Sequence, residues 1–432
     1  MTDPMREIHF TVPPGLRPRH EFDPGISDAT TIDNAVNLDL LGATAPPYPN
    51  GRLVSSAFGG LGRMLFTIND YALEDGYRNV FEGVFQSLPD TTRLVVLCYG
   101  DKRGEVETLL DDGGVLKRAE IVETGALINF SVWAEDAYVV IQQDGHGAPT
   151  LLEPANFTRY DDGFIADIVA AQTDIGSHSV PLYYQGGNVL IGDDYWMIGA
   201  DYPSKAHKLG LVQAKPGETR REAALRRYGE EIDATRRLVI LGTKNPVPEE
   251  RLRDITVNGQ PWKERVYYAT GVHQPLFHID MFVTLAGRNA DGEPIAVVGD
   301  PGMAAQILGE PEMPEMLIPY YHDIAARLAA EGFQVVRSPL PLTYADDSAL
   351  SERTWYFATA NNALVEIKGD SKRVWLPTYG HGPQAHLVAT DKENERIWRE
   401  ELGFKVHMLP DFHPFAYNAG AVHCISKYLE RD

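Results

Sequence analysis

Strand-like and helix-like segments alternate through most of the chain, and this alternation limits the fold more than any other feature of the sequence. Met64 to Ile68 is an apolar run typical of a strand, and Tyr71 to Leu88 follows with apolar residues at helical spacing. A helix-like and a strand-like segment again follow one another where the amphipathic Glu218 to Ile232 leads into Arg237 to Leu241. Such alternation predicts a mixed α/β protein built from repeated units.

Further segments carry the pattern towards the C-terminus. The sequence predicts strands at Leu116 to Val122, Val266 to Thr270 and Pro294 to Gly299, hairpins at Asn188 to Ile198 and at Trp355 to Ile367 with Arg373 to Pro377, and helices at Glu315 to Gly332 and Gly382 to Leu402. No low-complexity linker interrupts residues 51–432, which we expect to form a single domain. Residues 1–50 are rich in proline and lack periodicity, so we expect an extended N-terminal arm.

The charge of the chain argues against some classes of partner. Its formal net charge is −22, and such a surface repels nucleic-acid phosphates and anionic membranes but favours a cationic substrate. The first residues lack the layout of a signal peptide, and no apolar run approaches the ~18 residues that span a bilayer, so we expect a cytoplasmic protein. Only two cysteines are present, which excludes a CxxC zinc site and a disulfide framework.

The two cysteines have different surroundings. Cys98 lies in an apolar run and is expected to be a buried strand thiol. Cys424 follows the small residues Ala419, Gly420 and Ala421, which allow a tight bend, and it lies next to His423. Cys424 is therefore either a second buried thiol or a nucleophile whose thiolate is favoured by its surroundings.

Two further stretches combine small, aromatic and acidic residues. Trp133 is followed by the adjacent acids Glu135 and Asp136 just before an apolar run. Acids at such a position are usually solvated turn residues, although an aromatic neighbour can shield a carboxylate. In Gly186-Gly187-Asn188, the paired glycines allow close approach of the backbone to another group, and a simple β-bulge explains them equally well.

A histidine and an aspartate stand two residues apart in His278-Ile279-Asp280. If this segment is extended, both polar side chains lie on one face, beside the apolar run that follows. A single histidine in apolar surroundings is usually structural, whereas a histidine and an aspartate on one face are a stronger indication of an active site.

The order of these motifs resembles the guanidino-group-modifying enzymes, the pentein superfamily that includes agmatine, arginine and peptidyl-arginine deiminases. Trp133-Ala-Glu-Asp136 is similar to its Trp-x-x-Asp motif, Gly186-Gly187-Asn188 to its Gly-Gly motif, His278-Ile-Asp280 to its His-x-Asp motif and Gly420-Ala-Val-His-Cys424 to its Gly-x-x-x-Cys motif. Asn362, in Ala360-Asn-Asn-Ala-Leu-Val365, corresponds to an asparagine that lines the site in bacterial members. The resemblance implies a five-bladed α/β propeller with pseudo-fivefold symmetry, with residues 51–432 as a single catalytic domain.

The resemblance also implies a role for each matching residue. Asp136 and Asp280 would hold a substrate guanidinium, Cys424 would attack its carbon, and His278 would act as acid and base. Trp133, Gly187, Asn188 and Asn362 would line the substrate site. Arginine deiminases carry Glu before the Gly-Gly pair where this chain has Gln185, and Glu135 replaces an Arg that is usual in agmatine deiminases. The choice among these substrates is therefore open.

The predicted reaction is a cysteine-dependent hydrolysis. It converts a guanidino group to a ureido group, such as arginine to citrulline, with release of ammonia through a covalent thiouronium. No metal and no organic cofactor is expected. The partner would be a small cationic guanidine such as agmatine or arginine, or an arginine side chain of a peptide or protein; a homodimer is one arrangement that the sequence leaves open. The alternatives are an amidinotransferase of the same fold, a peptidase that uses Cys424, His278 and Asn362, and a non-catalytic pentein that only binds.

Overall fold

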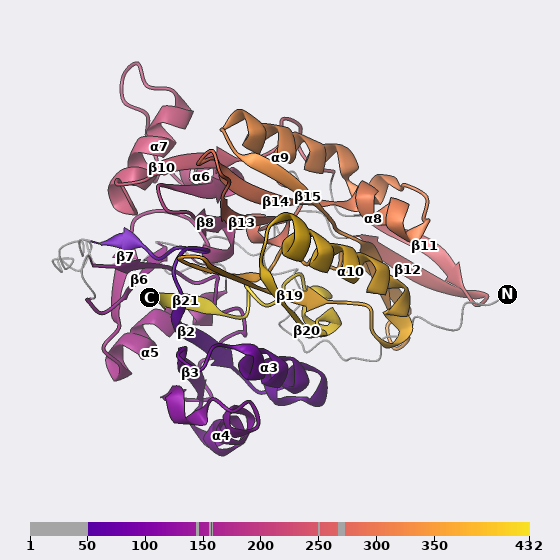
Figure 1. The fold of residues 1–432 in the computed structure, drawn as a ribbon, viewed down its shortest axis with the longest axis horizontal. Helices are drawn as coiled ribbons and strands as arrows, with labels where there is room; N and C mark the ends of the chain where they lie inside the picture. The colour runs from indigo at the N-terminus through magenta and orange to yellow at the C-terminus, as the bar shows by residue number, and fades with distance from the viewer. Residues whose placement is uncertain (1–50, 144–146, 155–156, 158, 249–250, 267–272) are drawn as a thin grey trace.

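The computed structural model describes residues 51–432, except 144–146, 155–156, 158, 249–250 and 267–272. The predicted arm, residues 1–50, and most of the predicted strand Val266 to Thr270 lie outside the described residues. Figure 1 shows a mixed α/β arrangement in which most helices lie around the outside of several small sheets. The α/β class predicted from the alternation is therefore confirmed.

Five of the six sheets in the described part of the chain share one pattern. A first strand runs antiparallel to a second, and the second runs parallel to a third. The sheets are β21–β2–β3–β4 (Lys427–Arg431, Leu61–Ile68, Arg93–Tyr99, Ala119–Thr124), β1–β5–β6–β7 (Arg52–Leu53, Val139–Gln142, Thr150–Pro154, Gly176–Val180), β8–β9–β10 (Val189–Ile191, Tyr195–Gly199, Arg237–Leu241), β13–β14–β15 (Val283–Arg288, Pro294–Asp300, Gln334–Pro339) and β18–β19–β20 (Leu364–Lys368, Ser371–Thr378, Lys405–Asp411).

Helices connect the parallel strands of each unit, as parallel pairing requires. They are α3 (Asp75–Ser87) and α4 (Arg103–Asp112) in the first sheet, α5 (Ile165–Gln172) in the second, α6 (Asp201–Lys208) and α7 (Arg220–Glu231) in the third, α8 (Pro301–Leu308) and α9 (Ile318–Ala330) in the fourth, and α10 (Val388–Arg396), extended by the π-turn Ile397–Glu401, in the fifth. A short helix, α11 (His413–Ala416), follows β20. The 3₁₀ turns are Tyr71–Leu73, Gly100–Lys102, Leu116–Arg118, Tyr160–Phe164, Gly186–Asn188, Ile279–Met281, Pro314–Met316 and Gly382–Leu387.

Local sequence signals explain where several helices begin and end. At α7, the Thr219 hydroxyl accepts from Glu222 N at 3.2 Å, and Thr219 N donates to the Glu222 carboxylate at 2.7 Å, which is a capping box. At α8, Asp300 caps the N-terminus, Pro301 opens the first turn, and Gly309 ends the helix with φ 69°. These caps satisfy backbone groups that a helix end would otherwise leave unpaired.

The sixth sheet, β11–β12–β17–β16, stands apart from the five units. It contains the hairpin β11 (Arg251–Val257) and β12 (Gln260–Val266) together with β17 (Glu352–Phe357) and β16 (Leu342–Asp347). Figure 1 shows this hairpin extending from the body of the molecule. No helix in the described ranges has both the length and the apolar character needed to cross a membrane.

Several predicted boundaries were wrong. Trp355 to Ile367 is not one strand, because β17 ends at Phe357 and β18 begins at Leu364, with a loop between them. Leu116 to Val122 starts as a 3₁₀ turn and becomes a strand only at Ala119. The predicted helix Gly382 to Leu402 is divided into a 3₁₀ segment, α10 and a π-turn. The hairpin at Asn188 to Ile198 is confirmed as β8–β9.

The five units bring the sequence motifs together because each motif occupies the same place in its unit. Asp136 precedes β5, Gly187 precedes β8, Asp280 precedes β13, Asn362 precedes β18 and Cys424 precedes β21. Each of these strands is the first strand of its unit, the one that runs antiparallel to its neighbour. Residues up to 288 positions apart in the chain, Asp136 and Cys424, therefore reach one site.

Candidate active site

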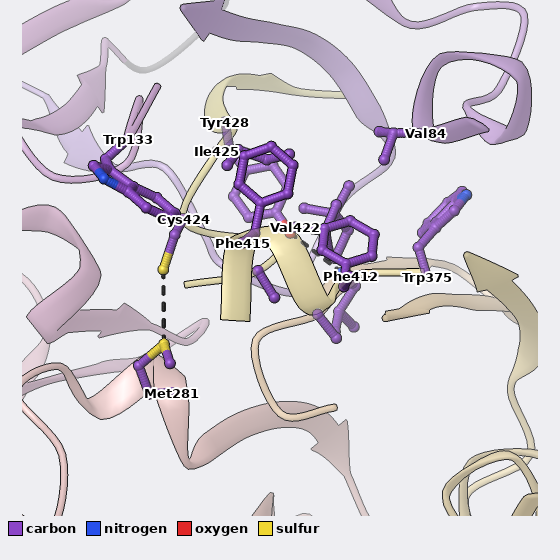
Figure 2. Close-up of a cluster of buried hydrophobic side chains, with 14 of the residues drawn as sticks. Val84, Trp133, Met281, Trp375, Phe412, Phe415, Val422, Cys424, Ile425 and Tyr428 are labelled. Atoms are coloured by element: carbon purple, nitrogen blue, oxygen red, sulfur yellow. Dashed lines mark hydrogen bonds between the residues drawn. The ribbon is translucent and has the colours of Figure 1, made fainter. Parts of the chain in front are cut away.

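Cys424 lies in the turn before β21, with 2% of its surface exposed. Its sulfur accepts a hydrogen bond from Asn362 Nδ2 at 3.0 Å and donates one to Asp280 Oδ2 at 3.5 Å. Met281 Sδ lies 3.9 Å from the same sulfur. Figure 2 shows the sulfur pointing away from Phe415 and towards Met281. The thiol is therefore buried, as a structural cysteine would be, but among polar groups that can control its charge.

Asn362 holds the turn that carries the cysteine. Its Oδ1 accepts from the backbone N–H groups of Ala421 at 2.9 Å and Cys424 at 3.1 Å, while its Nδ2 donates to the sulfur. Ala419, just before, adopts a left-handed conformation with φ 61°, which lets the chain turn sharply after α11. One buried amide thus fixes both the backbone around the sulfur and a donor for a thiolate.

Asp136 and Asp280 are buried with 3% and 2% of their surface exposed, so the solvated-turn interpretation of Asp136 is wrong. Asp136 Oδ2 accepts from Arg159 Nη2 at 2.9 Å, and Asp280 Oδ2 accepts from His423 Nδ1 at 2.8 Å. The other oxygen of each carboxylate, Oδ1, is buried without a hydrogen-bond partner among the described residues. The two aspartates therefore present two acceptors, which suits a ligand with at least two N–H donors.

His278 is completely buried beside Asp136. Its Nε2 lies 2.6 Å from Gln185 Oε1 and 2.9 Å from the Tyr202 hydroxyl. An amide oxygen can only accept, so Nε2 carries the proton and donates it to Gln185. Nδ1 is then the basic nitrogen, and it lies 3.5 Å from Asp136 Oδ1. The Gln185 side chain thus helps to orient the His278 ring.

Burial moves the titratable groups of the site towards their neutral forms. Burial, aided by repulsion from Asp280 and Asp136, raises the pKa of the Cys424 thiol well above its ordinary value. Burial raises the pKa of Asp280 from 3.8 to about 7, with repulsion from Asp136 acting in the same direction. Burial also raises the pKa of Asp136, which the Arg159 guanidinium opposes, and lowers the pKa of His278 from 6.5 to about 3. A cation between the two carboxylates would reverse the effect on the thiol.

Gly187 and Gly420 are positions where side chains of the site approach the backbone too closely for a Cβ. A Cβ on Gly187 would lie 2.5 Å from His278 Nδ1 and 2.9 Å from Asp136 Oδ1. A Cβ on Gly420 would lie 2.2 Å from the Trp133 ring. Both glycines have ordinary φ values, so close approach, and not a left-handed backbone, explains them.

The segment from His278 to Asp280 is extended only at His278, because a 3₁₀ turn begins at Ile279. The condition of a fully extended segment is therefore not met, although both side chains still reach the site. Asn188 is buried and exchanges amide hydrogen bonds with Gln274 at 2.9 and 3.3 Å. Its Oδ1 also accepts from Ile279 N at 3.1 Å, so the Asn188 side chain holds the backbone next to His278. The Gly-Gly segment is a 3₁₀ turn rather than a β-bulge.

Sequence reasoning missed several residues around the site. The sequence places His423 beside Cys424 but does not indicate its hydrogen bond to Asp280. Arg159 and Tyr202 lie in segments without a recognisable pattern, so no sequence signal indicated them. Lys427 forms a buried ion pair with Glu135, its Nζ lying 2.7 Å from Oε1. Among the described residues, no three His, Cys, Asp or Glu side chains are grouped so that they could hold a metal ion.

Comparison with known proteins gives matches through structure alone. No protein-family model matches the sequence, and no curated protein sequence matches it. An agmatine deiminase from C. jejuni, solved as a cysteine-to-serine variant with substrate bound, is 10% identical, with TM-score 0.56 over 88% of this chain and 96% of that one. A putative agmatine deiminase is 11% identical, with TM-score 0.61 over 90% of this chain and 99% of that one. The chain therefore has the fold of these proteins, as the motif order predicted.

Proposed function

We propose that this protein is a cysteine-dependent hydrolase that converts a guanidino group to a ureido group and releases ammonia. The observation that supports this most is the pair of unpartnered buried carboxylate oxygens, Oδ1 of Asp136 and Oδ1 of Asp280, on two aspartates whose charges both act on the Cys424 thiol. A guanidinium is planar, always charged and carries several N–H donors, so it can satisfy both oxygens at once. The carbon of such a ligand would then face the sulfur.

Substrate binding and activation of the nucleophile are coupled in this proposal. The two carboxylates raise the pKa of the Cys424 thiol, and a guanidinium bound between them cancels that repulsion. Nδ2 of Asn362 then donates to the thiolate. The nucleophile is thus generated only when the substrate is in place.

The reaction proceeds in two steps. As the guanidinium binds, the Cys424 thiol gives up its proton, which passes to Nδ1 of His278. The thiolate attacks the guanidinium carbon, the C–N bond breaks, and His278 returns that proton to the amine, which leaves as ammonia. A thiouronium now links Cys424 to the substrate. His278 next takes a proton from a water molecule, whose oxygen attacks the same carbon. The C–S bond breaks, and the ureido product and the thiolate are released.

The charges around the site favour a substrate without a carboxylate. Of the cations near the sulfur in the described residues, Arg159 already contacts Asp136 and Asp162, and Lys427 contacts Glu135. A substrate carboxylate would meet mainly acids here. We therefore propose an agmatine-like guanidine as the preferred substrate, in keeping with the fold shared with agmatine deiminases.

The test is release of ammonia and ureido product from agmatine, arginine and a blocked arginyl peptide. The matched variants are Cys424→Ala and Cys98→Ala, since Cys98 is the other buried cysteine and lies in β3. Turnover should disappear in the first variant and persist in the second. Turnover that survives Cys424→Ala would refute the mechanism, and product formed only when an amine is added would identify an amidinotransferase instead.

The finer expectations from the resemblance remain proposals. The recurrence of one strand pattern in five units supports, for residues 51–432, a single catalytic domain in the form of a five-bladed propeller. The peptidase alternative has less support, because Asn362 bonds to the cysteine and its backbone, whereas His278 bonds to Gln185. A cytoplasmic location and a homodimer also stay predictions.

A further inference from the structure

A cavity of about 390 Å³ shares no lining residue with the candidate active site. It lies where β1, the end of β5, the turn of the β8–β9 hairpin and the end of β21 meet. Three arginines, Arg52, Arg236 and Arg431, line it, together with Phe58 and a single acid, Asp193. Guanidinium groups thus outnumber carboxylates in the lining of this cavity.

Two of the charges in this lining are already neutralised. Arg236 pairs with Asp233, the Nη1 to Oδ2 distance being 2.8 Å. Asp193 pairs with Arg288, whose Nε lies 2.7 Å from Oδ2. The acid in the cavity is therefore held by an arginine outside it, and Asp193 offers Arg52 only its backbone oxygen, at 3.2 Å.

The other two arginines have no carboxylate partner among the described residues. Arg431 donates to three backbone oxygens, those of Ser55 at 2.9 Å, Gly59 at 3.3 Å and Val365 at 2.8 Å, and its Nη2 is buried without a partner. Among the described residues, the Arg52 side chain makes one hydrogen bond, to the Asp193 backbone oxygen. In a chain with 61 acidic and 39 basic residues, two guanidinium groups on one cavity without a carboxylate partner are unexpected.

We propose that this cavity binds a small oxyanion, through a phosphoryl or carboxylate group held by Arg52 and attracted by the positive charge of Arg431. The planar fork of Arg52 matches both groups and can bind either with two parallel hydrogen bonds. Arg236 adds positive charge, and Phe58 provides an apolar wall for the rest of the ligand. The cavity volume lies within the range of small-molecule sites.

This site is independent of the proposed deiminase reaction. Its lining contains none of the residues that contact Cys424, and binding there involves no covalent step. Arg431 ends β21, the strand that begins three residues after the cysteine, so the two sites lie at opposite ends of one strand. An anion bound at one end would thus stabilise a strand on which the other site depends.

The experiment is isothermal titration of the full-length protein with pyrophosphate and with citrate, at constant ionic strength. We expect saturable binding of at least one probe, and the tighter probe identifies the phosphoryl or carboxylate class. Arg52→Glu should weaken that binding at least about tenfold, because a charge-assisted hydrogen bond is replaced by repulsion. Arg52 is exposed and makes one hydrogen bond, so the variant should fold normally.

The matched control is Arg399→Glu, which makes the same charge change in the π-turn that extends α10. This control should bind the probe as tightly as the unaltered protein does. The proposal would be overturned if neither probe bound saturably, or if Arg399→Glu weakened binding as much as Arg52→Glu.

Discussion

Replacing Asp280 by asparagine should make the protein more stable and less active at the same time. Burial raises the pKa of this carboxyl from 3.8 to about 7, so the folded protein holds the proton more tightly than the unfolded chain does. The stability that this carboxyl contributes is therefore complete below pH 3.8 and is lost as the pH rises through about 7. A shift of roughly three units corresponds to about 4 kcal/mol, which is the largest gain to expect from Asp280→Asn above pH 7.

The substitution keeps the shape of the side chain and its main contact. The asparagine oxygen can still accept from His423 Nδ1, which lies 2.8 Å from Asp280 Oδ2. Turnover should nevertheless fall at least about tenfold, because a charge-assisted hydrogen bond to the guanidinium is lost.

Urea unfolding measured near pH 4 and near pH 8 tests this reasoning, with Asp370→Asn in the exposed turn between β18 and β19 as the control. The free energy of unfolding of Asp280→Asn should exceed that of the unaltered protein near pH 8, with little difference near pH 4. A variant that is destabilised near pH 8, or stabilised equally at both pH values, would refute the assignment of Asp280 as a buried acid with a raised pKa.

Three further variants test other contacts of the site. Gly187→Ala places a methyl group 2.5 Å from His278 Nδ1, so kcat should fall about a hundredfold or more while circular dichroism stays unchanged. Gln185→Glu puts a carboxylate beside His278 Nε2 and should raise the pKa of this imidazole from about 3, which moves the acid limb of the kcat/KM profile to higher pH. Glu135→Gln leaves the Lys427 charge buried without its partner, and thermal unfolding should show a loss of about 3–5 kcal/mol.

The sequence allowed the fold class and the convergence of the four motifs to be predicted because both depend on short local patterns. Alternating apolar periods indicated α/β units, and Asp136, His278, Asp280 and Cys424 each lie in a motif just before a strand. Convergence of these motifs follows from the repetition of one unit, so their order along the chain carried information about their positions in space.

The remaining features depend on contacts that no local pattern encodes. Arg159 reaches Asp136 from a segment with no distinctive sequence. Tyr202 lies near the start of α6, and no motif there indicates its contact with His278. The prediction that Trp355 to Ile367 is one strand failed because Ala358 and Ala363 are buried in a loop, where apolar character reflects packing and not strand pairing.

The pairing of β21 with β2 has a consequence for the order of folding. Leu61 of β2 pairs with Arg431 of β21, so this edge of the first sheet stays open until a segment 370 residues further along the chain has been synthesised. An open strand edge invites pairing with other chains, and β21 removes that hazard. Since the Cys424 turn leads directly into β21, the pairing of β21 with β2 closes this edge of the sheet and positions Cys424 in one step. The candidate site therefore cannot be complete before this strand pair has formed.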